Sequence, residues 1–492
     1  MSEAATPPDD IATLAKGGRT NFIGFWLRLA ARIPFLFIAG RVYGAEALGR
    51  MAYAILIIEF AAQIATVGLR RGLALQLAKD ECSDTHEVWD ALLTVFVVAL
   101  PATMFLMFFP QIMFPNSQLR GLDLLIPLTI FLIAATDIML AALAYRFDIA
   151  SSVRARAIIE PWTISIAAGV MAVFAAKEDG LLIAYVLSVF AALIASAVPF
   201  IRSFGLPRDW RPNPARVWAL ARRNTPLALA DALEWLSRRI DLAILGLFVS
   251  PATVGIYYVA QQVTSLPQKL KTSFDPVLGP VITRKLGAGD RAAVAKQISQ
   301  VGFWILAAQA GGALALGIPG EAVLGLVGPN FVNGNGALAF LLIAEVAAAA
   351  AVVSEAALIY IAGYRNVMIS AAMIGVQTAL SFLFIMVIRA QGYNEFYQAA
   401  GPAIALAVSL ALGSIIKVNL AQKLLGAPVS VWRWPLVWAS ATAALVGWVA
   451  TKGPEWSELM FGVPAVVLTY SVIIWKRGFG AEDRALFRKT SA

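Results

Sequence analysis

The chain has 492 residues, of which 60% are hydrophobic and 14% charged, and its mean hydropathy is +0.75. Soluble proteins carry about a quarter charged residues, so this composition excludes a soluble globular enzyme and predicts a membrane protein. The net charge of +9 is of the kind seen in nucleic-acid-binding proteins. However, the positions of Lys and Arg follow a membrane topology, and we expect no nucleic-acid partner.

The residue types that carry most covalent and metal chemistry are scarce. The single Cys82 and the single His86 exclude a disulfide framework, a Cys-based metal site and a His cluster. The sequence also has no G-x-x-x-x-G-K-[ST] loop, no G-x-S-x-G and no H-E-x-x-H. We therefore expect no enzyme, no metal site and no cofactor.

Apolar runs of about 20 residues, the length that crosses a hydrocarbon core, recur along the chain. Residues 1–15 are polar and contain acids, so we expect no cleavable signal peptide, and the first span would direct insertion. The sequence predicts fourteen spans, at about 20–43, 49–70, 88–110, 122–145, 153–176, 180–201, 224–248, 252–281, 296–318, 335–362, 366–388, 397–418, 434–451 and 458–475.

The distribution of basic residues supports this number of spans. With a cytoplasmic N-terminus, 29 of the 39 Lys and Arg fall on cytoplasmic segments and six on outer ones. One span too few or too many early in the chain would reverse the sides of all later segments and abolish this bias. Both termini are therefore expected in the cytoplasm of a multi-pass protein of the bacterial inner membrane.

The first helix pair, residues 19–78, recurs later in the chain. A shift of 206 positions places Arg32 on Arg238, Gly40 on Gly246, Gly49 on Gly255 and Ala54 on Ala260. Both copies start from the same side of the membrane, so the repeat is parallel. The expected fold is an all-α polytopic membrane protein with two six-helix lobes and two additional C-terminal helices.

The repeat also predicts the domain boundaries. The longest cytoplasmic connection, residues 203–223, is basic and contains Pro and Trp, which favours either a linker with a short helix on the membrane surface or a solvated loop. The expected parts are a cytoplasmic tail (1–19), an N-lobe (20–202), the linker (203–223), a C-lobe (224–418), two final spans (419–476) and a cytoplasmic C-terminal tail (477–492). The predicted outer loops are short, which disfavours a membrane glycosyltransferase or polymerase.

Charged and polar residues interrupt the first two spans. Arg28 and Arg32 share one face of the first helix with Asn21. Neither arginine has an acid on its own face, so Glu59 of the second span is the expected partner. Glu59, Gln63, Thr66 and Arg70 follow the 4-3-4 spacing of one helical face. Charges within a bilayer face protein or a water-filled cavity, although Arg28 could also reach the membrane surface along its flexible side chain.

The seventh and eighth spans carry the matching positions. Asp231, Glu234, Arg238 and Asp241 follow 3-4-3 spacing, with Arg239 beside them. Either they form a structural ion-pair network or they line a cavity. In the eighth span, Lys269 matches Gln63, and Gln261 and Gln262 are further polar candidates. Other acids within spans are Asp137, Glu160, Glu345 and Glu355.

The stretch GRVYGAEALGRMAYA from Gly40, followed by Val67-Gly-Leu and the basic segment 70–79, resembles the N-terminal signature of the polysaccharide-transporter (Wzx-like) flippases. These belong to the MOP superfamily, with the MATE exporters and lipid II flippases. The resemblance covers essentially the whole chain. It implies a V-shaped, two-lobed transporter that moves an undecaprenyl-pyrophosphate-linked oligosaccharide to the outer leaflet by alternating access, for surface polysaccharide, exopolysaccharide or O-antigen synthesis.

The family's cavity is typically cationic, and the resemblance maps it onto Arg28, Arg32, Arg238, Arg239 and Lys269. Arginine forks suit pyrophosphate oxygens independently of the family. The five basic residues are therefore the candidates for pyrophosphate binding. The candidates for a coupling-ion site or a charge network are Glu59, Asp231, Glu234 and Asp241. The candidates for polar residues of the cavity are Asn21, Gln63, Gln261 and Gln262. A monomer is expected, together with a polysaccharide polymerase or a chain-length regulator as partner. The alternatives are a proton- or sodium-coupled MATE-type multidrug exporter and a lipid II flippase.

Overall fold

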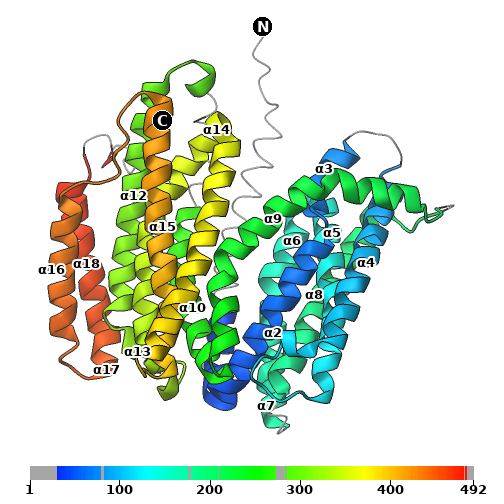
Figure 1. Cartoon of the computed structure of the whole chain (residues 1–492), viewed down its shortest axis with the longest axis horizontal. Helices are drawn as coiled ribbons and strands as arrows, with labels where there is room; N and C mark the ends of the chain where they lie inside the picture. The colour runs from blue at the N-terminus through cyan, green and yellow to red at the C-terminus, as the bar shows by residue number, and fades with distance from the viewer. Residues whose placement is uncertain are drawn as a thin grey trace. The chain divides into compact units, whose positions relative to one another are not determined.

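The structure is a computed structural model, and it describes residues 30–78, 83–174, 179–208, 210–272, 282, 285–480 and 483–484; the side chains of 269–272 are not described. Within these residues the chain is helical and contains no strand (Figure 1). The predicted all-α fold is confirmed.

The chain forms two compact units. Unit 1 comprises Met1–Arg239 and Ser250–Gly255, and unit 2 comprises Ile240–Val249 and Ile256–Ala492. The division between them falls within one long helix, α9, rather than in a loop. The assignment of residues 203–223 as an inter-lobe linker stays a prediction.

Unit 1 is a bundle of long helices joined by short turns. After a helical stretch from Ala30, its elements are η1 (Ala39–Tyr43), α2 (Gly44–Ala65), α3 (Leu69–Leu77), α4 (Asp84–Phe108), η2 (Pro110–Ile112), η3 (Gly121–Leu124), η4 (Ile126–Leu128), α5 (Thr129–Tyr145), α6 (Ile149–Val153), η5 (Arg154–Ile159), α7 (Glu160–Val173), α8 (Gly180–Phe204) and most of α9 (Pro214–Phe248). Residues 214–223 of the predicted linker thus form the first turns of α9. This helix contains Pro226 and bends along its length (Figure 1).

Unit 2 has the same construction. Its elements are α10 (Pro251–Thr272, whose first residues belong to unit 1), α12 (Arg291–Gly317), α13 (Gly320–Gly325), η6 (Pro329–Gly334), α14 (Asn335–Ala390), α15 (Glu395–Leu425), α16 (Pro435–Ala450), α17 (Glu455–Ser457), η7 (Glu458–Gly462), α18 (Val463–Ile473) and η8 (Ile474–Gly478). The final pair, α16 and α18, lies side by side (Figure 1).

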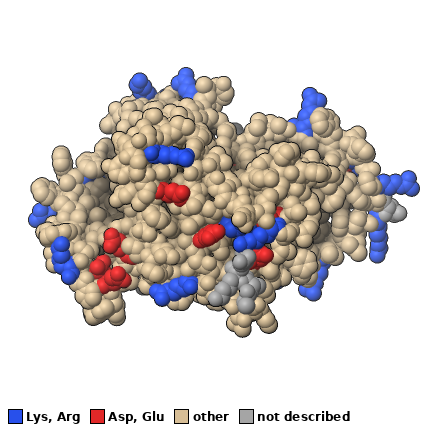
Figure 2. Space-filling view, turned by 60° about the horizontal axis from the view of Figure 1, so that its bottom comes forward, with Lys and Arg blue, Asp and Glu red and all other residues tan. Residues whose placement is uncertain are grey.

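Within the described residues, nine segments are long and apolar enough to cross a membrane. Two of them correspond to two predicted spans each: Ala30–Leu77 to the second span and the described part of the first, and Pro329–Ala390 to the tenth and eleventh. The thirteenth predicted span corresponds to the shorter apolar helix α16. The predicted seventh and eighth spans fall on α9 and α10, whose polar residues lower their hydropathy. The surface agrees with a membrane location, because uncharged side chains cover most of the face in Figure 2.

The two glycines that the repeat makes equivalent lie against each other. A Cβ on Gly49 of α2 would overlap the Pro251 carbonyl and lie 2.6 Å from the backbone nitrogen of Gly255, at the start of α10. A Cβ on Gly255 would lie 2.9 Å from the Gly49 nitrogen. The lack of side chains therefore permits backbone contact between these helices, as is common where membrane helices pack closely.

The long helix α14 is kinked, and an ion pair between Glu355 and the buried Lys417 joins it to α15. Ala362 has φ −150° and ψ 50°, which interrupts the helix. Glu355, before the kink, accepts a hydrogen bond from Lys417 of α15 at 3.0 Å and one from Asn366, after the kink, at 3.1 Å. Lys417 also donates to Ser370 at 2.9 Å. These hydrogen bonds connect α15 with the parts of α14 before and after the kink, and they stabilise the kinked conformation.

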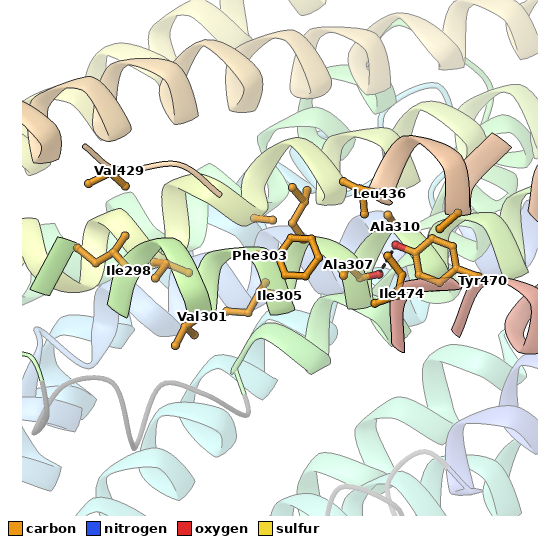
Figure 3. Packing of buried hydrophobic residues seen from close by; sticks show 14 of the residues in the cluster. Ile298, Val301, Phe303, Ile305, Ala307, Ala310, Val429, Leu436, Tyr470 and Ile474 are labelled. Carbon is orange, nitrogen blue, oxygen red and sulfur yellow. Dashed lines mark hydrogen bonds between the residues drawn. The ribbon is translucent and has the colours of Figure 1, made fainter. Parts of the chain in front are cut away.

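The hydrophobic core of unit 2 extends to the end of the described chain. Phe303 of α12 lies among Ile298, Ile305, Leu436 and Ile474 (Figure 3). The Arg433 guanidinium lies 4.2 Å from the centroid of the Phe303 ring. It also donates a hydrogen bond to the Asp483 carboxylate at 2.6 Å. Arg433 therefore contacts both the hydrophobic core and the C-terminal segment.

Asp483 is buried, and four donors hold its carboxylate. Besides Arg433, these are Gln300 (2.9 Å), the Trp304 indole (2.9 Å) and the Gly480 amide (2.8 Å). Burial raises the pKa of Asp483, but the hydrogen bonds outweigh it, and the net pKa lies below its ordinary value of 3.8. Through its hydrogen bonds to Gln300 and Trp304, the ionised carboxylate therefore holds the C-terminal segment against α12.

We expect Gly49→Ala to lower the melting temperature of the purified protein, because overpacking costs about 1–3 kcal/mol. The matched control is Gly375→Ala, since a Cβ there meets no atom within 4 Å and Ala favours the helix. Thermal unfolding in detergent measures both. Equal melting temperatures for the two variants would contradict close packing at Gly49.

We expect Asp483→Asn to lower the melting temperature at pH 7 by the equivalent of about 1–3 kcal/mol, through weaker charge-assisted hydrogen bonds. Because the folded-state pKa is depressed, the stabilisation is present above the unfolded value of 3.8 and is lost as the pH falls through the lower folded-state value. The difference between wild type and variant should therefore shrink below pH 4. A difference that stays constant between pH 7 and pH 3 would refute this role.

Candidate functional site

A polar stripe runs along α2 and continues into α3. Gly68, with φ +71°, ends α2 in a left-handed turn and lets α3 begin at Leu69. Glu59 is half-buried and Arg70 is exposed, whereas Gln63 and Thr66 between them are buried. The Gln63 amide nitrogen has no hydrogen-bond partner among the described residues. The stripe therefore offers unsatisfied polar groups in an apolar region.

Three of the predicted α9 residues meet in one ion-pair network. Arg71 of α3 contacts Asp231 at 2.8 Å and Glu234 at 2.6 Å, and Glu234 also contacts Arg238 at 3.0 Å. The Asp231 side chain is fully buried, whereas Arg71 is 48% exposed. A buried carboxylate requires such a partner, because desolvation of an isolated charge costs several kcal/mol.

Small residues and an aromatic pair bring these helices together. A Cβ on Gly68 would lie 2.5 Å from the Ala228 nitrogen, and one on Gly72 would overlap the Asn224 side chain. Farther along, the rings of Phe60 and Trp235 lie 4.9 Å apart. The backbones of α3 and α9 can thus approach closely enough for Arg71 to reach both acids.

A second charge group joins α5, η5 and α7. Arg156 pairs with Asp137 and, at 2.8 Å, with Glu160. The side chains of all three are between 16% and 26% exposed, so the group is largely buried. Asp137 and Glu160 are acids that the sequence placed within spans, and Arg156 satisfies both.

Glu59 lies next to this second group. The charges of Arg239, Glu160, Arg156 and Arg32 act on its carboxylate. Arg32 and Glu59, which the sequence predicts as partners, form no ion pair within the described part of the chain, so their pairing stays a prediction. Arg32 and Arg239 are half-buried, and neither they nor Arg70 make an ion pair or a hydrogen bond to any residue that the structure describes.

The remaining candidates lie elsewhere or outside the described residues. Asp241, in unit 2, accepts hydrogen bonds from Tyr257 at 2.6 Å and Gln261 at 2.8 Å rather than joining the Arg71 network. Gln262 is buried, and its side-chain oxygen has no described partner. Arg28, Asn21 and the Lys269 side chain fall where the structure gives no description, so their roles stay predictions.

Sequence reasoning missed Arg71 and Arg156. Both lie close to the ends of predicted spans, where basic residues are expected on the cytoplasmic side. The spacing of Arg156 and Glu160 at i,i+4 was an available signal for one of them. No local spacing indicated the pairing of Arg71, because Asp231 and Glu234 lie 160 and 163 residues away along the chain.

Most of the acids in this region have a described ion-pair partner, whereas three of its arginines have none. Four of the five acids are already bound by Arg71, Arg156 or Arg238, and only Glu59 lacks a described ion-pair partner. Arg32, Arg70 and Arg239 each retain a five-donor guanidinium. Such a site is suited to an anionic group with several oxygens.

Comparison with solved structures identifies the fold. The lipid II flippase MurJ in an inward closed conformation is 11% identical, with TM-score 0.69 and coverage of 95% of this chain and 100% of that one. An inward-facing multidrug resistance MATE family transporter is 14% identical, with TM-score 0.64 and coverage of 81% and 94%. A MOP superfamily transporter from Pyrococcus furiosus is 13% identical, with TM-score 0.57 and coverage of 84% and 95%. The fold is therefore that of the MOP superfamily.

Among curated protein sequences there is no significant match. A family model, described as polysaccharide biosynthesis protein, matches residues 29–285, which is more than half of the chain. This match agrees with the resemblance found in the first helix pair, which lies almost entirely inside the matched range. The chain belongs to the polysaccharide biosynthesis protein family.

Proposed function

We propose that the protein is a flippase that moves a polyprenyl-pyrophosphate-linked oligosaccharide from the cytoplasmic to the outer leaflet of a bacterial inner membrane. Membership of the polysaccharide biosynthesis family and the MOP fold both support a transporter rather than an enzyme. Both termini lie in the cytoplasm in this proposal. The protein acts as a monomer and delivers its substrate to a polysaccharide polymerase or chain-length regulator.

The observation that carries the proposal is the set of arginines without described partners. Arg32, Arg70 and Arg239 lie beside acids, most of which other arginines already hold. Guanidinium groups bind phosphate oxygens bidentately, and a low-dielectric surrounding strengthens the attraction. A pyrophosphate supplies the acceptors that these donors lack.

The same observation weighs against an exporter of organic cations. A cation would need free carboxylates, but Asp137, Glu160, Asp231 and Glu234 are engaged by arginines. Glu59 is the acid that remains, and we assign it the role of coupling the cycle to an ion. Arg28 adds to the cationic character in this proposal, and Gln63 meets the sugar; the roles of Lys269 and Gln262 stay predictions.

Expression in a bacterial strain that lacks its own repeat-unit flippase tests the proposal. The wild type should restore surface polysaccharide and clear the accumulated lipid-linked oligosaccharide. Arg32→Ala and Arg239→Ala should each reduce export about tenfold or more, because each removes charged hydrogen bonds worth roughly 1.5–3 kcal/mol. Arg389→Ala, an exposed arginine of unit 2, is the control and should export normally.

Full export by both variants would overturn the cationic site. No rescue with any glycan, together with resistance to cationic dyes, would instead support the exporter.

Arg71→Ala should destabilise the protein by about 3 kcal/mol, since it leaves the buried Asp231 without its ion pair and Arg71 itself is half exposed. The double variant Arg71→Ala/Asp231→Asn should recover much of this loss. Arg70→Ala, at the neighbouring position without a described partner, is the control and should melt like the wild type. Thermal unfolding in detergent compares the four proteins, and an undiminished melting temperature for Arg71→Ala would show that the network is not structural.

A further inference from the structure

An apolar groove lies on unit 1, away from the charged stripe. Its cavity volume is about 400 Å³. It is formed by α4, α5 and α8, which lie side by side (Figure 1), and by the segment that precedes α9. Its lining is aromatic and aliphatic, and it includes Trp89, Phe96, Phe131, Leu132, Ala135 and Trp210.

The groove lies on helices whose exposed side chains are largely apolar. All three helices belong to segments long and apolar enough to span a membrane. Phe96, in its wall, is 54% exposed, and the rings of Phe96 and Phe131 pack 4.9 Å apart. Because an empty apolar cavity forfeits van der Waals contacts, a lipid chain in the bilayer would fill it.

Two tryptophans lie at one end of the groove. Trp89 and Trp210 line this end with ring centroids 6.4 Å apart. The buried Asp90 carboxylate accepts the Trp210 indole N–H at 2.8 Å, which fixes the ring as a wall of the groove. The Trp89 indole donates to the Gly205 carbonyl at 3.4 Å. Tryptophans held in this way are typical of the headgroup level of a bilayer.

Basic side chains gather at the same end. Arg216 contacts the Asp90 carboxylate at 3.2 Å, so it lies next to Trp210. Arg208 and Arg211 flank Trp210 in sequence and are exposed, and neither side chain has a described partner. His86 is hydrogen-bonded to the Arg208 carbonyl at 3.0 Å, which ties this segment to the start of α4. These arginines are therefore close in sequence or by contact to Trp210, which lines the groove.

We propose that this groove is a binding site for an anionic glycerophospholipid, with one acyl chain between α4, α5 and α8 and the phosphate against Arg208 and Arg211. The apolar walls select a hydrocarbon chain, and the arginines select a negative headgroup. Arg216 and Trp210, both held by Asp90, shape the junction between the two. The site is separate from the arginines of the proposed transport path and does not depend on which substrate is carried.

The test uses the full-length protein, delipidated in detergent, with bound lipid counted by native mass spectrometry. Phosphatidylglycerol should bind more tightly than phosphatidylcholine of the same chain length. Arg208→Gln/Arg211→Gln should weaken phosphatidylglycerol about 25-fold, at roughly fivefold for each arginine, and leave phosphatidylcholine unchanged. Arg389→Gln is the control and should bind phosphatidylglycerol as the wild type does.

Ala135→Phe fills the groove and tests the chain subsite. It should reduce the binding of both lipids, provided that its melting temperature shows a folded protein. If it does not fold, Leu132→Ala, which enlarges the groove, should favour longer acyl chains over shorter ones. Equal binding of the two lipids, no loss in the double glutamine variant, or displacement of phosphatidylglycerol by equimolar undecaprenyl phosphate would each overturn the proposal.

Discussion

The cost of placing arginine and carboxylate groups inside membrane helices governs this structure. An unpaired charge at mid-membrane costs roughly 2.5–3.5 kcal/mol even on insertion scales. In unit 1, ion pairs reduce this cost. Arg71 pairs with two acids of α9, and Arg156 pairs with one acid of α5 and one of α7. Helix positions follow from these pairs, because α3 must lie against α9 for Arg71 to reach Asp231. The glycines at 68 and 72 permit that approach.

The charges left over after this pairing give the molecule its proposed chemistry. A network of fully paired charges would be inert toward a ligand. Arg32, Arg70 and Arg239 stand beside paired acids without a described partner of their own. In the proposed function, an anionic headgroup would complete their hydrogen bonding and would be released again because most of the surrounding charge is already balanced. A transport site must bind its substrate and then release it, which requires that the hydrogen bonding of its charged groups is incomplete before the substrate binds.

Much of the architecture was predictable from sequence, because hydrophobic length and the bias of Lys and Arg are collective signals carried by many residues. The 206-residue repeat paired Gly49 with Gly255, and the structure brings these two residues into contact. The helical spacing of Asp231, Glu234 and Arg238 correctly placed them together. The partners Arg71 and Arg156 were not predictable as such, since pairing between helices depends on packing that no local spacing encodes. The groove between α4, α5 and α8 escaped detection for the same reason, because three separate helices contribute its walls.

The central claim is that the protein moves a lipid-linked oligosaccharide across a bilayer through an anion-binding site. Its most direct test is reconstitution of the purified protein in liposomes containing an undecaprenyl-pyrophosphate-linked oligosaccharide. The fraction of glycan that an impermeant glycosidase can reach from outside is then followed in time. Our account predicts that the protected glycan becomes accessible in protein-containing liposomes and stays protected in protein-free ones. Glycan that remains protected in both, while the same liposomes transport a cationic dye, would contradict it.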